Sequence, residues 1–175
     1  MTKTPNYAEK SIHRTYIEAP IETVRSILGA TDQPLPFFFG SICDKKDGLK
    51  AGVRMRMVHP NRKIAMVVGD VLAFEPPHRY SHTFKMTNLK DDPCTVTYEL
   101  REKNGGTEFD LIIENAIEGS DLHKQMVGGQ KFIAKNLKRL AETGKPALTG
   151  TMVTVMSPLV GMMAKKEQRI ENWPL

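Results

Sequence analysis

The pattern of apolar and polar positions divides the chain into a strand, a short helix, a run of strands and a long helix. Residues 10–18 are rich in β-branched and aromatic side chains, which predicts a first strand. Ala19-Pro20 then begins a helix, because proline suits a first helical turn. The apolar residues on one face of this helix are Ile21, Val24, Ile27 and Leu28. Residues 34–40 hold two prolines and three phenylalanines and predict at most a short helical turn.

From residue 51 to residue 116 the hydrophobic period changes to two, which predicts at least four antiparallel strands. The turn signals that separate the later strands are Glu75-Pro76-Pro77-His78, Lys90-Asp91-Asp92-Pro93 and Asn104-Gly105-Gly106. The strand between the first two turns carries Tyr80, His82, Phe84 and Met86 on one face. These strands together predict an antiparallel meander.

A long helix is expected to complete the domain. Ser120 suits its N-cap, and Gly144 followed by Pro146 gives a stop signal. Its apolar face consists of Leu122, Met126, Gly129, Ile133, Leu137 and Leu140. An antiparallel sheet with one helix across its face is an α+β arrangement, which we predict for residues 10–144. If the sheet curves, the helix closes a cavity instead of a solid core.

Residues 145–175 are predicted to form a C-terminal extension. Ser157-Pro158 suits a helix start, so a short amphipathic helix is expected from about Pro158 to Ile170. Four of the ten methionines lie in this extension, namely Met152, Met156, Met162 and Met163. The extension could cover the mouth of a pocket, form a homodimer contact, lie on a membrane surface or dock on its own domain. Of these four interpretations we favour docking.

Several short segments together carry a resemblance to a known family. They are APIETV, GDVLAFEPPHRYSHTF, VTYEL, GGTEFDL and NLKRLAETG. Over residues 10–144 the chain resembles the START-like (SRPBCC, polyketide cyclase) superfamily with the helix-grip fold. Within it, the chain is more similar to the branch homologous to activators of the 90-kDa heat-shock protein ATPase. It departs from the common pattern at Arg25, where tryptophan is usual, and in the uninterrupted triple Phe37, Phe38 and Phe39.

The resemblance implies a curved antiparallel sheet that grips the C-terminal helix, with a deep pocket between them. Members of the superfamily bind lipids, hormones or polyketides, and some catalyse cyclisation or dehydration, while relatives in the closer branch bind the chaperone. We therefore expect first a module that binds a small hydrophobic or aromatic ligand, without a cofactor. One alternative is a chaperone-cofactor-like protein-interaction domain. The other is a cyclase- or dehydratase-type enzyme that uses Asp70 and His82, although we lean against an enzyme.

Strand parity and the apolar face of the long helix place one set of side chains on the predicted inner surface. This set comprises Phe38, Met55, Met57, Met66, Val68, Asp70, Tyr80, His82, Phe84, Tyr98, Ile113, Met126, Gly129 and Ile133. Such residues can equally form a plain core, and the resemblance favours a ligand pocket. Gly128-Gly129 lies in the middle of the helix, where each glycine costs ~1 kcal/mol relative to alanine. This pair indicates either close helix–sheet contact or room for a ligand.

Asp70 and His82 form the candidate polar pair. If Met66 and Val68 face the cavity, parity places Asp70 there too, and adjacent antiparallel strands bring it near His82. A buried carboxylate beside an imidazole can orient a ligand or transfer protons. The interpretation that we favour is simpler, with Asp70 as a partly solvated structural residue. His78 and His82 would lie ~13 Å apart on one strand at ~3.3 Å per residue, so no metal site is predicted.

Charge and cysteine content narrow the expected setting. The chain has 25 Lys and Arg against 20 Asp and Glu, a net charge of +5. Lys124, Lys131, Lys135 and Lys138 form a stripe opposite the apolar face of the long helix, without interleaved aromatic residues. We therefore expect a solvated surface and no nucleic-acid partner. Two cysteines, no secretory signal and no apolar stretch of ~18 residues favour a cytoplasmic protein without a transmembrane segment.

Overall fold

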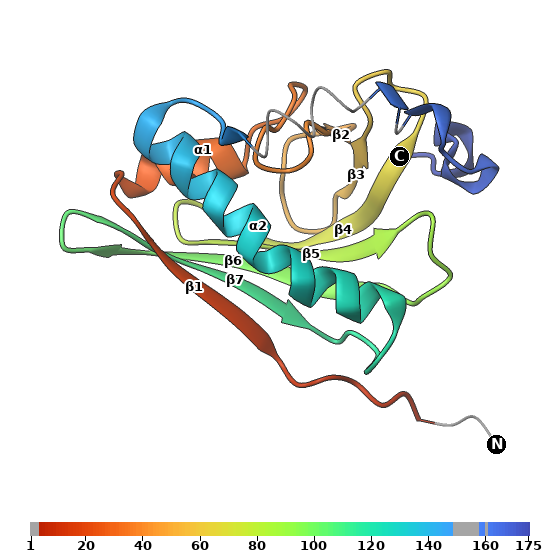
Figure 1. Ribbon diagram of the computed structural model, residues 1–175, viewed down its shortest axis with the longest axis horizontal. Helices are drawn as coiled ribbons and strands as arrows, with labels where there is room; N and C mark the ends of the chain where they lie inside the picture. The colour runs from red at the N-terminus through yellow and green to blue at the C-terminus, as the bar shows by residue number, and fades with distance from the viewer. Residues whose placement is uncertain (1–3, 149–157, 160) are drawn as a thin grey trace.

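Seven strands form one antiparallel sheet in this computed structural model, which describes residues 4–148, 158–159 and 161–175. Their spatial order is β1-β7-β6-β5-β4-β3-β2. The strands are β1 (Ser11–Ile17), β2 (Ile42–Lys45), β3 (Arg54–Val58), β4 (Ala65–Glu75), β5 (Arg79–Met86), β6 (Cys94–Lys103) and β7 (Gly106–Glu114). Helix α1 (Ile21–Leu28) follows β1, and the long helix α2 (Asp121–Thr143) follows β7 and crosses one face of the sheet (Figure 1). The predicted α+β helix-grip fold is confirmed.

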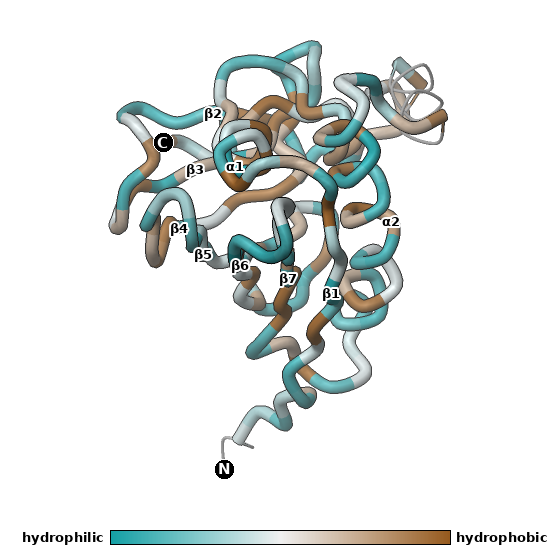
Figure 2. The backbone as a smooth tube through the Cα atoms, turned by 90° about the vertical axis from the view of Figure 1, so that its left-hand side faces the viewer, coloured by the Kyte–Doolittle hydropathy of each residue, from teal (hydrophilic) through white to brown (hydrophobic). Residues whose placement is uncertain are grey.

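The predicted signals at both ends of α2 act as expected. The Ser120 hydroxyl accepts a hydrogen bond of 3.1 Å from the His123 N–H, and Gly144 adopts the left-handed conformation with φ of 68°. Leu122, Ile133 and Leu137 are buried. Figure 2 shows hydrophilic and hydrophobic residues alternating along β1 and recurring along α2, as expected for elements with one buried face.

Two regions differ from a simple alternating meander. β2 is a strand of four residues at the edge of the sheet that the hydrophobic pattern does not predict, because so short a segment shows little alternation. β4 contains two irregularities: its register shifts against β3 between Met57 and Val58, and against β5 between Val71 and Ala73. A bulge adds a residue to one strand and thereby changes which side chains face the core.

Residues 161–175 of the C-terminal extension lie against the domain beside β3 and β4 (Figure 1). Residues 158–159 and 161–162 are helical, and two 3-10 helices follow, η1 (Lys166–Gln168) and η2 (Ile170–Asn172). The expected continuous helix to Ile170 is therefore wrong. The Ile170 N–H donates to the Lys63 carbonyl at 3.0 Å, and the Arg56 guanidinium donates to the Trp173 carbonyl at 2.7 Å.

Part of the sequence prediction for the extension lies outside the described residues, namely the positions of Met152, Met156 and Ser157. In the described part of the chain, no helix combines the length and the apolar character needed to cross a membrane.

Candidate ligand-binding site

Two adjoining chambers occupy the space between the sheet, α2 and the extension. The tail-side chamber, about 430 Å³, is bounded by the sheet and by Met163, Ala164 and Gln168 of the extension. The helix-side chamber, about 360 Å³, lies under the first half of α2 and is bounded by Met126, Gly128 and Gly129. The two chambers share the lining residues Phe38, Phe39, Phe84, Met86 and Gln125.

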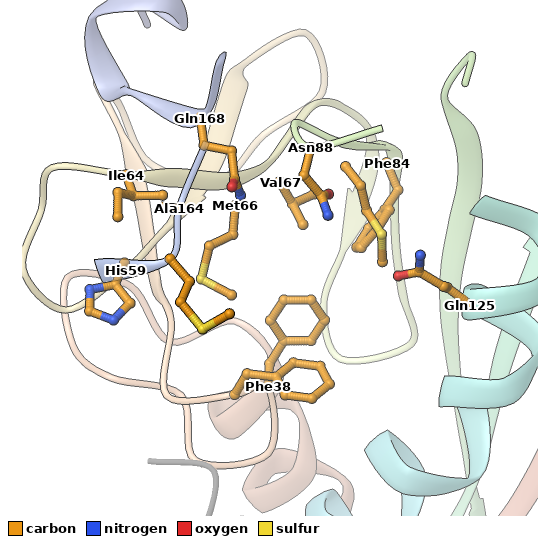
Figure 3. Close-up of a pocket in the computed structure, with 13 residues that line it drawn as sticks. Phe38, His59, Ile64, Met66, Val67, Phe84, Asn88, Gln125, Ala164 and Gln168 are labelled. Carbon is orange, nitrogen blue, oxygen red and sulfur yellow. The ribbon is translucent and has the colours of Figure 1, made fainter. Parts of the chain in front are cut away.

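The walls are mostly apolar, and a few amide side chains lie among them. Figure 3 shows three amide side chains around the tail-side chamber. Gln168 comes from the extension, Asn88 from the loop after β5, and Gln125 from α2. No Lys, Arg, Asp or Glu among the described residues lines either chamber. An apolar enclosure with a few neutral polar groups suits an uncharged organic molecule better than an ion.

The Phe37–Phe39 triple forms the wall between the chambers and the packed end of the domain. Residues 36–40 make a tight turn in which Phe39 and Gly40 have φ values of 53° and 66°. This turn holds the Phe39 ring stacked on Phe132 of α2 at 5.1 Å, and sets Phe38 edge-on to Phe84 of β5 at 6.2 Å. The triple thus joins α2 to the sheet across the cavity instead of filling it.

The paired glycines of α2 leave room in the helix-side chamber. An added Cβ at Gly128 or Gly129 would meet nothing within 4 Å. Close helix–sheet contact is therefore excluded for this pair. Gly128 is exposed to solvent, and Gly129 is partly buried, and both border the helix-side chamber. The next residue, Gln130, is buried and fixed: its amide donates to the carbonyls of Ser11 and Leu111, and its carbonyl oxygen accepts from the Ser11 hydroxyl at 2.7 Å.

A small recess of about 20 Å³ adjoins the helix-side chamber. It shares Phe38, Phe84 and Tyr98 with that chamber and adds Tyr80 and His82 to its lining. The three polar rings are close together: the ring centroid of Tyr80 lies 5.1 Å from that of His82 and 5.6 Å from that of Tyr98. This recess is the most polar part of an otherwise apolar interior.

Burial controls the ionisation of the recess. His82 is only 3% exposed, and burial lowers the pKa of its imidazole to about 4. Burial also raises the pKa of the Tyr80 and Tyr98 phenols above their usual value. It raises the pKa of the Cys43 thiol, which lines the same recess, to about 11. All four groups are therefore neutral around pH 7, and the recess presents hydrogen-bonding groups without charge.

A family model described as "Activator of Hsp90 ATPase homolog 1-like protein" matches residues 19–142, which include α1, strands β2 to β7 and almost all of α2. The chain belongs to this family. No curated protein matches it.

Solved structures share the fold of this family member at low sequence identity. The Aha1 dimer from Colwellia psychrerythraea is 15% identical with a TM-score of 0.63, covering 79% of this chain and 99% of that one. An HSP90 activator from Plasmodium falciparum is 19% identical with a TM-score of 0.58, covering 76% and 96%. CalU16 from Micromonospora echinospora is 18% identical with a TM-score of 0.58, covering 86% and 84%.

The expected pairing of Asp70 with His82 does not form in this family member. Asp70 lies on the outer face of the sheet, where its carboxylate accepts a hydrogen bond from the Arg54 guanidinium at 3.3 Å with both side chains about half exposed. Val71, the next residue, is the one that pairs with His82. The prediction fails because Met66 and Phe74 do contact the core, but the bulges of β4 separate them from the alternation around Asp70.

Val68 shares the parity of Asp70 and lines neither the chambers nor the recess, although it is buried. Its strand neighbours Arg56 and Lys85 belong to the outer side, and Arg56 holds the carbonyl of Trp173 there. The prediction that Val68 and Asp70 face the cavity is therefore wrong. Asp70 matches the favoured interpretation of a partly solvated structural residue.

The structure gathers the other candidate residues around one continuous interior. Those that line the chambers are Phe38, Met66, Phe84, Tyr98, Ile113, Met126, Gly129 and Ile133. Those added by the recess are Met55, Met57, Tyr80 and His82. Sequence reasoning missed Phe39 and Gln125 as lining residues, and it gave cover of a pocket mouth by the extension only as one of four interpretations. Phe39 and Gln125 lie beside predicted positions, whereas nothing in the sequence indicates where Met163, Ala164 and Gln168 dock.

Proposed function

We propose that this family member binds a small apolar or aromatic molecule in the two chambers. Each chamber falls within the range of roughly 300–1,000 Å³ that is typical of small-molecule sites. The observation that carries the proposal is the mostly apolar helix-side chamber of about 360 Å³, which Gly128 and Gly129 border. Alanine at either position would meet no atom within 4 Å and would stabilise the helix by ~1 kcal/mol, so the sequence forgoes helix stability beside this chamber.

Fluorescence titration with N-phenyl-1-naphthylamine tests this proposal. The wild-type protein is expected to bind the probe with a blue shift and increased emission. Gly129→Phe places a ring in the helix-side chamber and should weaken binding about tenfold or more, equivalent to ~1.4 kcal/mol. Val127→Phe is the matched control, because Val127 is an exposed position of the same helix. No binding by the wild-type protein, or equal weakening by both variants, would contradict the proposal.

Acid–base catalysis by Asp70 and His82 receives no support, because Asp70 lies on the outer face of the sheet. A role as a cofactor of an Hsp90-type chaperone is a second candidate, favoured by the description of the family. Its test is an ATPase assay of the chaperone with and without this protein, in which unchanged turnover argues against the role. Homodimer formation through the extension is also a proposal, and light scattering of wild-type and Met162→Ser, Met163→Ser protein tests it.

A further inference from the structure

The polar atoms of the recess have unused hydrogen-bonding capacity. Among the described residues, no hydrogen bond engages the phenolic oxygens of Tyr80 and Tyr98 or Nε2 of His82. At the same time, no side-chain nitrogen or oxygen of those residues is both fully enclosed and without a partner. The three atoms therefore border open space, in side chains that are at least nine-tenths buried. Buried polar groups normally have a partner, so this arrangement indicates one.

The tautomer of His82 determines what that partner must supply. Nδ1 lies 2.9 Å from the Thr83 carbonyl oxygen, which can only accept a hydrogen bond, so Nδ1 carries the proton. The ring is neutral, and Nε2 therefore presents a lone pair to the recess. A partner at Nε2 must donate a hydrogen bond. The tyrosine hydroxyls can both donate and accept, so they can complete the bonding of the same group.

The size of the recess limits the partner to a single polar atom. A water molecule needs about 10–15 Å³ of such volume, and the recess offers about 20 Å³. Phe38, Phe84 and Tyr98 border both this recess and the helix-side chamber, so the two spaces adjoin at these three rings and a ligand in the chamber would lie next to the recess. No described Lys or Arg lines the recess or the helix-side chamber, and His82 is neutral at pH 7, so a carboxylate or phosphate there would lack a counter-charge.

We propose that the recess is a subsite for one hydroxyl group of an uncharged aromatic ligand, held by His82 Nε2 with Tyr80 and Tyr98. The proposal rests on the proposed function and adds the class of ligand to it. The aromatic body lies in the helix-side chamber, and its hydroxyl donates to Nε2. An unsubstituted hydrocarbon fills the same chamber and leaves the recess unsatisfied.

A matched pair of probes, 2-naphthol and naphthalene, tests the subsite by isothermal titration calorimetry at neutral pH. The wild-type protein is expected to bind 2-naphthol about five- to tenfold more tightly than naphthalene, the range for one added hydrogen bond. His82→Phe should abolish this preference and leave naphthalene affinity within about twofold. Tyr98→Phe removes only an oxygen atom and should reduce the preference, which keeps the test available if His82→Phe does not fold.

Nitrogen-15 NMR of the wild-type protein gives a second readout. 2-Naphthol should shift the His82 Nε2 resonance, and naphthalene should leave it nearly unchanged. Equal affinities for the two probes and an unmoved Nε2 resonance would show that the recess holds only water, which overturns the subsite but leaves the proposed function standing. Failure to bind either probe would overturn both. A preference that survives unchanged in His82→Phe and Tyr98→Phe would also overturn the subsite.

Discussion

The two halves of α2 face the same sheet and do different work. In the second half, Ala134 and Leu137 are fully buried and pack with α1 and β1 in a continuous core. In the first half, Met126 is only partly buried, and Gly128 and Gly129 lie over a chamber. Gln130 marks the boundary with three hydrogen bonds to β1 and β7. One helix can thus provide stability at one end and accessible volume at the other.

The largest expected effect on stability comes from a substitution in the packed second half of α2. Leu137→Ala should lower the free energy of unfolding by about 3–4 kcal/mol, because a fully enclosed leucine leaves a cavity that cannot collapse. Met126→Ala in the open half should cost about 1 kcal/mol, since its side chain already borders empty space. Urea denaturation of both variants measures the contrast. Equal losses would mean that the two halves are packed alike.

The second prediction tests whether water reaches the His82 imidazole in the recess next to the open half of α2. In the unfolded chain the pKa of His82 returns to about 6.5, whereas burial holds it at about 4 in the folded protein. The unfolded state therefore binds the proton first, and stability is lost as pH falls from about 6.5 toward 4, by ~1.4 kcal/mol per unit between these limits. The neighbouring Cys43, Tyr80 and Tyr98 stay neutral in this window and do not add to it.

Urea denaturation at a series of pH values between about 7 and 5 measures this slope, with His82→Phe as the control that should flatten it. Arginine and lysine partners lower the pKa of the Asp110 and Glu108 carboxyls, although burial opposes them, so their contribution is lost only below the usual carboxyl range of ~3.9–4.3. If the free energy of unfolding changed equally with pH in the wild type and in His82→Phe, water would reach the His82 imidazole in the folded protein.

The same contrast explains which features the sequence could predict. The helix α2 as a whole follows from local rules: the spacing of Leu122, Ile133 and Leu137, the Ser120 cap and the Gly144 stop all agree with the structure. The hairpin at Asn104-Gly105 also agrees, with φ values of 49° and 80° that such turns require. These elements depend on residues close in sequence, and so the fold could be predicted almost completely.

The open half depends on contacts that local rules do not encode. Strand alternation predicts that Asp70 faces inward, but the two bulges of β4 put it on the opposite face from Met66 and Phe74. A bulge depends on the pairing with neighbouring strands, which the local sequence does not specify. Next to Asp70, position 69 requires glycine, because an added Cβ would clash with the Thr83 carbonyl oxygen of β5, and this constraint also comes from the neighbouring strand. The docking of the extension likewise depends on Lys63 and Arg56, more than 100 residues away.

The third prediction concerns the boundary between the halves. Gln130→Met keeps the side-chain volume but removes the donor to the Ser11 and Leu111 carbonyls. We expect a loss of about 1–2 kcal/mol, because buried acceptors are left without this partner. Hydrogen exchange of the β1 amides should increase along with that loss. Lys131→Met is the control at an exposed neighbouring position, and a loss of the same size there would show that the bonds of Gln130 do not hold the boundary.

The smallest effect comes from replacing glycine with alanine, once in the open half of α2 and once at the C-terminal end of its packed half. Gly128→Ala should raise the free energy of unfolding by about 1 kcal/mol, because its Cβ meets open space and alanine favours the helix. Gly144→Ala should lower it by about 1 kcal/mol, because φ of 68° suits glycine alone at this helix end. Thermal denaturation gives both signs. If Gly128→Ala were destabilising, the open surroundings of its Cβ would be contradicted, and this exposed position of the helix would be in contact with other atoms.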